Sequence, residues 1–204
     1  MYRPQKYVKD DKKFVFSFVN ENPFATVVMN GTRLMATHLP VLAQGDENNW
    51  TLYTHLANHN EQAKLIRDGA EALVIFHGPH SYISSSWYKE KDISTWDYTA
   101  VHVNAKIRLQ SREELEASLE KLVRYFEKDQ QDPLYYKEIP EKMLDDHLPL
   151  ITGFWLEPFK VEGLAKLHQS YPEHDVKAVS EKLENSGDSI KQKLAQDIKK
   201  EHKI

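Results

Sequence analysis

The sequence predicts a mainly β, α+β fold, in which an antiparallel β-barrel carries peripheral helices. Three observations predict it. Six or seven short runs are rich in apolar, aromatic and β-branched residues, and short polar turns join them. The dipeptide Asn30-Gly31 between two of these runs is a strong β-hairpin signal. Helical periodicity is confined to the start of the chain, the stretch after residue 110 and the C-terminal end.

The first third of the chain predicts one helix and then three strands. Asp10-Asp11 can cap a helix that ends before Asn22-Pro23 and places four apolar residues on one face. The hairpin strands follow, and Pro40 predicts a break in the second of them. The four apolar residues are Phe14, Val15, Phe18 and Val19, and the strands are 24–29, 33–42 and 50–56.

The stretch from Asn49 to Asn60 begins as a strand and ends in a polar cluster. Asn58, followed three residues later by Glu61, predicts a capped helix that stops near Gly69. Backbone N–H groups at a helix N-terminus favour an anion such as a phosphate. An ordinary strand–turn–helix junction is the alternative interpretation of the same residues.

The middle of the chain predicts further strands and one well-marked helix. We expect a strand over 72–76, an interruption at 77–80, an extended run over 81–88 and a strand over 95–103. Asn104-Ala105 predicts a turn into 106–109. Ser111 and Glu114 form a capping-box pattern, and a helical stripe continues to about Asp129.

The last part of the chain predicts a short helix near Met143, a strand and two helices. We expect the strand over 150–161 and a helix capped by Asp175, with a break at Ser186-Gly187. The predicted organisation is a barrel domain over 1–172, with an N-terminal helix and inserted helices, followed by a C-terminal helical tail over 173–204.

The composition of the chain limits the classes of protein to which it can belong. The chain has 204 residues, no Cys and a formal net charge of −4, which argues against a broadly basic nucleic-acid surface. Thiolate catalysis and cysteine-ligated zinc are excluded. No apolar run approaches the roughly 20 residues that span a bilayer, and no signal sequence follows the charged N-terminus. We therefore expect a cytoplasmic protein that does not enter a membrane.

A set of ordered motifs runs from Ala36-Thr37-His38-Leu39-Pro40 and 54–60 through 78–88 and 95–102 to 151–154 and 166–170. In order and spacing these motifs resemble those of the PaiB family of FMN-binding negative regulators of transcription. The resemblance implies the FMN-binding split barrel, normally a homodimer with flavin in a cleft between subunits. It also implies a repressor of protease-production and sporulation genes.

The resemblance to oxidases of this fold assigns residues to the FMN site. Arg33 to His38 is similar to a phosphate-gripping strand motif, with His38 where a lysine is usual. Thr54 to Asn60 is similar to a second motif, with Asn58 and Asn60 in place of Ser and Lys. The two Asn residues supply no positive charge, so Lys64 or Arg33 would have to compensate. The complete expected FMN set is Arg33, Thr37, His38, Thr54, His55, Asn58, Asn60, Lys64, Ser84, Trp87 and Trp96.

Each expected site residue also has an ordinary structural interpretation. The threonines suit strands, and the tryptophans suit a core or a dimer interface. His55 and His59 have i, i+4 spacing, but no carboxylate partner accompanies them, so we expect no metal site. Lysines near the C-terminus are interspersed with acids, which is typical of a solvated face, so DNA binding rests on the resemblance alone. An FMN-dependent oxidoreductase or flavin reductase, and a haem-binding split barrel, remain alternatives.

Overall fold

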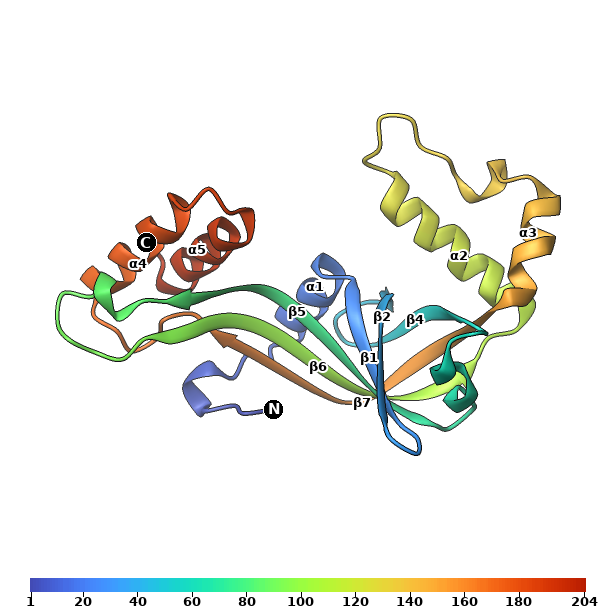
Figure 1. Cartoon of the computed structure of the whole chain (residues 1–204), viewed down its shortest axis with the longest axis horizontal. Coiled ribbons are helices and arrows are strands. Elements are labelled where there is room, and N and C mark those ends of the chain that lie inside the picture. Colours follow the sequence, from blue (N-terminus) through green and yellow to red (C-terminus); the bar gives the residue numbers. More distant parts are fainter. The chain divides into compact units, whose positions relative to one another are not determined.

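A computed structural model describes all 204 residues. It contains one antiparallel sheet and five α-helices, with short 3-10 helices between them (Figure 1). No helix is both long and apolar enough to cross a membrane. The α-helices are α1 (Lys12–Glu21), α2 (Arg112–Glu127), α3 (Glu141–His147), α4 (Glu173–Glu184) and α5 (Ser189–His202). The strands are β1 (Phe24–Asn30), β2 (Leu34–Pro40), β3 (Leu42–Gly45), β4 (Trp50–Ala57), β5 (Glu71–Ile83), β6 (Thr95–Leu109) and β7 (Ile151–Lys166).

The seven strands form one sheet in the order β2-β1-β5-β6-β7-β4-β3. Its two ends, β2 and β3, are separated in the chain by Val41 alone, which is fully buried. A single residue cannot span the width of a flat seven-stranded sheet, so the sheet must curl until its ends approach each other. The order stays open between β2 and β3, which confirms the expected split barrel.

The local turn and cap signals are confirmed. β1 and β2 pair antiparallel from Phe24↔Pro40 to Asn30↔Leu34, as the Asn30-Gly31 signal predicts. The Asp11 carboxylate accepts the Phe14 N–H at 2.8 Å at the start of α1. Ser111 and Glu114 cap α2 reciprocally.

Two predicted interruptions are wrong, because β5 and β6 each continue through them. In β5, Gly78 lets the backbone pass close to Phe18, where a Cβ atom would lie 2.7 Å from the ring. The alternation of buried and exposed residues shifts by one position at Pro79, as in a β-bulge. In β6, Ala105 is fully buried and continues the inward-facing row of the strand, so no turn forms there.

One compact unit consists of Met1–Phe18, His77–His102 and Glu162–Ile204. In this unit the helices α4 and α5 lie side by side (Figure 1). Their fully buried side chains pack with Ile83, Tyr88 and Leu167 in the core. Asp175 is not the cap of α4: it lies in the first turn and accepts the Lys89 N–H at 2.8 Å. The division into a domain over 1–172 and a tail over 173–204 stays a prediction.

The other compact unit consists of Val19–Phe76 and Val103–Val161 and holds the curled part of the sheet. In it, α2 packs Leu122 and Tyr125 against a cluster of Leu42, Tyr53 and Trp155 from β3, β4 and β7. The Tyr125 hydroxyl also donates to the Asn20 carbonyl at 2.6 Å. The inserted helix α2 therefore covers part of β3, β4 and β7. Of these strands, β4 leads into the expected FMN-phosphate motif.

Candidate functional site

The expected helix N-terminus after β4 differs from the prediction. The element is a short 3-10 helix, η2 (Glu61–Leu65), and its N-cap is Asn60 rather than Asn58. Asn58 instead donates to the Pro149 carbonyl at 2.9 Å and accepts from Thr152 at 2.6 Å. Asn58 therefore connects the end of β4 to the start of β7, and five residues of 3-10 helix present no α-helical dipole to an anion.

A closed hydrogen-bond network joins β2 to η2. The Asn60 amide donates to the Thr37 hydroxyl at 3.1 Å, and that hydroxyl donates to Gln62 Oε1 at 2.7 Å. The buried Gln62 completes it, because its side chain donates to the Val27 carbonyl at 3.0 Å and its backbone N–H donates to Asn60 Oδ1 at 2.9 Å. Sequence reasoning missed Gln62; its position directly after the polar cluster was the signal available. Thr37 and Asn60, both members of the expected FMN set, thus lie together, and each is bonded within the protein.

Positive charge flanks this network. Arg33, in the turn between β1 and β2, forms an exposed ion pair with Glu61. Lys64 on η2 is exposed and forms no hydrogen bond or ion pair. His38 is exposed on β2, where its ring lies beside Phe24 and its Nδ1 lies 3.3 Å from the Thr26 hydroxyl. Two cations beside hydroxyl and amide groups have the chemistry that a phosphate requires, so the donor set fits FMN in charge.

The two remaining expected residues of this unit lie on β4. Thr54 is buried and donates to the Pro40 carbonyl at 2.8 Å, which holds β4 against the end of β2. His55 pairs with Gly153 on β7 and is half-buried. Burial lowers the pKa of His55, so its imidazole is neutral near pH 7. A neutral imidazole supplies no charge to a phosphate.

The other three expected residues, Ser84, Trp87 and Trp96, belong to the unit that contains the C-terminal helices. The expected extended run over 81–88 ends at Ile83, and Ser84 then caps the 3-10 helix η3 (Ser85–Trp87). Trp87 packs partly against the core of that unit. Trp96 is 55% exposed on β6. Trp87 therefore has a packing role, and Trp96 is the more available for a ligand.

Around Trp96 lies a cluster of aromatic and imidazole rings that sequence reasoning did not assemble. We call it the β5–β6 ring face. The His77 and His80 ring centroids are 4.5 Å apart, and His80 stacks on Trp96 at 6.4 Å. Burial, and then the neighbouring His80, lower the pKa of His77. The alternating ring residues of each strand were the sequence signal for this face. Its members are His77, His80, Tyr82, Trp96 and Tyr98.

Behind this face, a fully buried Asp97–His168 pair joins β6 to the end of β7. His168 Nδ1 donates to Asp97 Oδ2 at 2.8 Å, and Tyr171 stacks on the imidazole with ring centroids 3.9 Å apart. Lys166 Nζ lies 3.9 Å from the other Asp97 oxygen and donates to the Trp96 carbonyl at 2.7 Å. Burial lowers the pKa of Lys166, and Asp97 opposes that shift. The pair is sealed from solvent, so it positions the backbone beside Trp96 rather than contacting a ligand.

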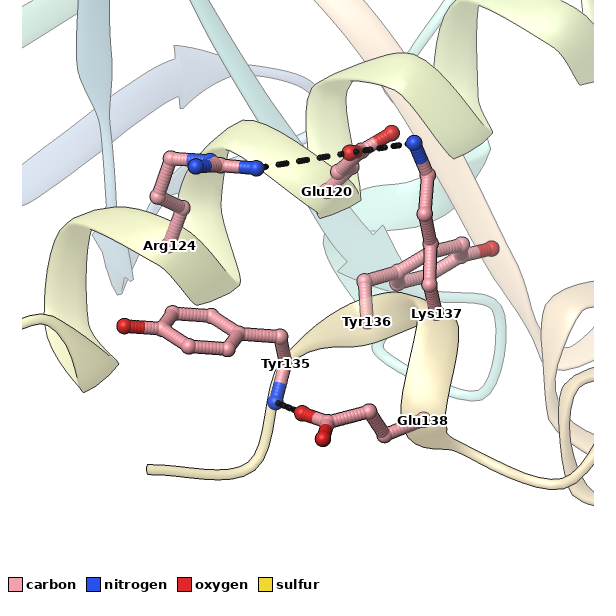
Figure 2. Close-up of a pocket in the computed structure, with 6 residues that line it drawn as sticks. All are labelled: Glu120, Arg124, Tyr135, Tyr136, Lys137 and Glu138. Carbon is pink, nitrogen blue, oxygen red and sulfur yellow. Dashed lines mark hydrogen bonds and ion pairs between the residues drawn. The ribbon is translucent and has the colours of Figure 1, made fainter. Parts of the chain in front are cut away.

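A small cavity of about 130 Å³ lies between α2 and the segment before α3 (Figure 2). Glu120 forms ion pairs with Arg124 and Lys137, and the Tyr135 N–H donates to Glu138 at 2.7 Å. Its charges are thus paired within the protein. None of the expected FMN residues lines it.

A larger cleft of about 620 Å³ lies beside β4 and β7. The Arg108 guanidinium lies 5.5 Å from the centre of the Trp155 ring and pairs with Glu114 and Glu157. Trp155 Nε1 donates to Glu114 at 3.0 Å. The hydrogen bonds from Arg108, from the Ser111 N–H and from Trp155 hold the pKa of Glu114 below its usual range. None of the expected FMN residues lines this cleft either.

Comparison with known sequences gives matches that span most of the chain. A family model described as "Putative FMN-binding domain" matches residues 1–158. The chain is also 32% identical over 197 residues to "Protease synthase and sporulation protein PAI 2" of Bacillus subtilis (strain 168). That alignment covers 96% of this chain and 95% of the relative.

Comparison with solved structures supports the fold. The flavocytochrome Anf3 from Azotobacter vinelandii aligns with a TM-score of 0.60 at 14% identity, covering 87% of this chain and 78% of that one. The FAD and haem binding protein from Mycobacterium smegmatis aligns with a TM-score of 0.57 at 14% identity, covering 81% and 76%. At this identity the likeness shows a shared fold and no shared activity.

Proposed function

Because the chain belongs to the PaiB family of FMN-binding domains, we propose that it is a homodimeric, cytoplasmic FMN-binding negative regulator of transcription. The 32% identity to a protease synthase and sporulation protein, over nearly the full length of both chains, carries this proposal. Genes of protease production and sporulation are the corresponding targets.

In this proposal Arg33 and Lys64 bind the FMN phosphate. Both are exposed cations beside the network of Thr37, Asn60 and Gln62, which holds η2 against β2. His38 is an exposed residue of the expected set in the same unit and remains available to the rest of the flavin. Bound FMN supplies redox chemistry, whereas the chain supplies charge and positioning.

An FMN titration followed by flavin fluorescence tests the cofactor assignment. We expect the wild type to quench the fluorescence and Arg33→Ala or Lys64→Ala to weaken binding by about 10-fold or more, because a hydrogen bond to a charged group contributes roughly 1.5–3 kcal/mol. Arg67→Ala is the matched control, since Arg67 is an exposed cation just after η2 and outside the expected set. Equal binding by all three variants refutes the assignment to Arg33 and Lys64.

Promoter DNA binding at several salt concentrations tests direct repression. Direct contact predicts affinity that falls steeply with salt, whereas a protein that acts through a metabolite shows no such binding. Steady oxidation of a reduced nicotinamide in the presence of FMN would instead identify the oxidoreductase alternative.

A further inference from the structure

A groove of about 440 Å³ adjoins the small cavity of Figure 2 and is lined by α2, α3 and the segment between them, which contains the 3-10 helix η4 (Tyr136–Glu138). Groove and cavity share the lining residues Glu120, Tyr136 and Lys137. A volume of this size suits a small organic molecule. The apolar part of the groove lining consists of Ala117, Ile139 and Leu144.

The charged lining of the groove is mainly acidic. Glu116 and Glu120 lie four residues apart on α2 and therefore share a face of the helix, and Glu141 begins α3. Glu116 pairs with Arg112, whereas Glu141 is exposed and forms no ion pair. Acidic residues also outnumber Lys and Arg over 111–147 as a whole. These charges favour a ligand that carries positive charge.

One ammonium group of the protein already occupies this position. Lys137 reaches from η4 to Glu120 on α2, with 3.1 Å between its Nζ and the carboxylate (Figure 2). The Lys137 side chain is 78% exposed, and an exposed pair of this kind contributes little stability because water and salt screen it. An ammonium group from solution can therefore replace Lys137 at little cost. Lys137 also shows what this position accepts, which is an ammonium group on an aliphatic chain.

Tyr136 supplies an unused polar group beside these carboxylates. The residue is 9% exposed, and its hydroxyl is buried without a hydrogen-bond partner. Burial, and then the nearby Glu116 and Glu120, raise the pKa of Tyr136, so the phenol stays neutral near pH 7. Buried hydroxyl groups without a partner are uncommon and costly. An N–H group of a ligand that donates to the Tyr136 oxygen would satisfy it.

We propose that this groove binds a protonated aliphatic amine. The ammonium group of the ligand replaces Lys137 Nζ at Glu120 and donates to the Tyr136 hydroxyl, while its carbon chain packs against the apolar part of the lining. None of the expected FMN residues lines the groove, so this proposal and the FMN assignment can each fail without the other.

Calorimetric titration at low salt with hexylamine, hexanol and hexanoate tests the proposal. The three probes share one chain length and differ in the charge of the head group, so we expect only hexylamine to bind. Glu120→Gln should weaken hexylamine binding by about 10-fold or more, because the bond to a charged acceptor is lost. Asp146→Asn, on α3 but outside the groove lining, is the matched control and should bind like the wild type.

Tyr136→Phe gives a readout that a purely structural residue would not give. It should weaken hexylamine binding by about 2–10-fold. It should not lower the midpoint of urea unfolding, because the hydroxyl that it removes has no partner in the free protein. Tighter binding of Nα-acetyl-lysine amide than of hexylamine would identify a protein lysine as the natural source of the ammonium group, and the reverse order would identify a free amine.

Two lysine variants separate this site from general attraction between an acidic surface and a cation. Lys137→Ala removes the internal competitor and should strengthen hexylamine binding by about 2–5-fold. Lys142→Ala removes the same charge from α3 outside the groove lining and should leave binding unchanged. The proposal is overturned if hexylamine does not bind, if hexanol binds as tightly, or if the two lysine variants strengthen binding equally. It is also overturned if Glu120→Gln, with an unchanged circular dichroism spectrum, binds hexylamine like the wild type.

Discussion

Removal of the Asp97 carboxylate should be among the most damaging single changes in the unit that holds the C-terminal helices. Asp97 and His168 are both fully buried, and their hydrogen bond of 2.8 Å is the main polar contact of each side chain. Asp97→Ala leaves the His168 Nδ1–H without an acceptor and leaves Lys166, 3.9 Å away, without its anion. Leaving a buried hydrogen-bonding group without its partner typically costs about 1–3 kcal/mol, and more where the group is charged. That loss is a large fraction of the roughly 5–15 kcal/mol that stabilises an ordinary domain.

Equilibrium unfolding in urea, at one fixed protein concentration, measures the loss. We expect Asp97→Ala to lower the unfolding midpoint strongly at an unchanged m-value, and Asp97→Asn to lose less because its amide oxygen still accepts from His168. The control is Asp146→Ala, which breaks the exposed Lys142–Asp146 pair of 3.0 Å and should leave the midpoint unchanged. A loss of less than about 1 kcal/mol for Asp97→Ala would refute the reasoning that this pair stabilises the unit.

Three further changes probe the fold. Gly78→Ala places a Cβ atom 2.7 Å from the Phe18 ring and should lower the free energy of unfolding by about 1–3 kcal/mol. An unchanged midpoint of urea unfolding would contradict the close packing. Ser111→Ala removes half of the α2 capping box and should cost about 0.5–2 kcal/mol, with helix content by circular dichroism as the second readout. Burial lowers the pKa of His55 below 6.5, so the unfolded state binds the proton more readily and stability falls as pH falls through 6.5. His55→Gln should reduce the fall in the free energy of unfolding between about pH 8 and pH 5. If the variant shows the same pH dependence as the wild type, other titrating groups cause the decline.

Signals that act within a few residues predicted the structure well. The Asn30-Gly31 hairpin, the Asp11 cap of α1 and the Ser111–Glu114 capping box all form as the sequence indicates. In each case the stabilising partners are neighbours in the chain, so the same interactions are available before any tertiary structure exists.

Signals whose outcome depends on distant partners were less reliable. Pro79 was expected to interrupt its strand, but β5 continues with a local bulge. Asn58 was expected to cap a helix, but its amide bonds to Pro149 and Thr152, more than 90 positions away, and Asn60 takes the cap. Local propensity allows both outcomes, and the non-local contact selects one of them.

The candidate sites likewise combine features that local signals predict with features that depend on contacts between distant residues. Periodicity and the ordered motifs indicate the fold class and the family, and the resemblance places both Thr37 and Asn60 in the expected FMN set. The assembled sheet was needed to show that Thr37, Asn60 and Gln62 form one network, that Asp97 meets His168 across 71 positions, and that the β5 and β6 rings share one face. The physical reason is that strand pairing brings together residues whose separation in the chain carries no periodic signal, so their contacts depend on the assembled sheet.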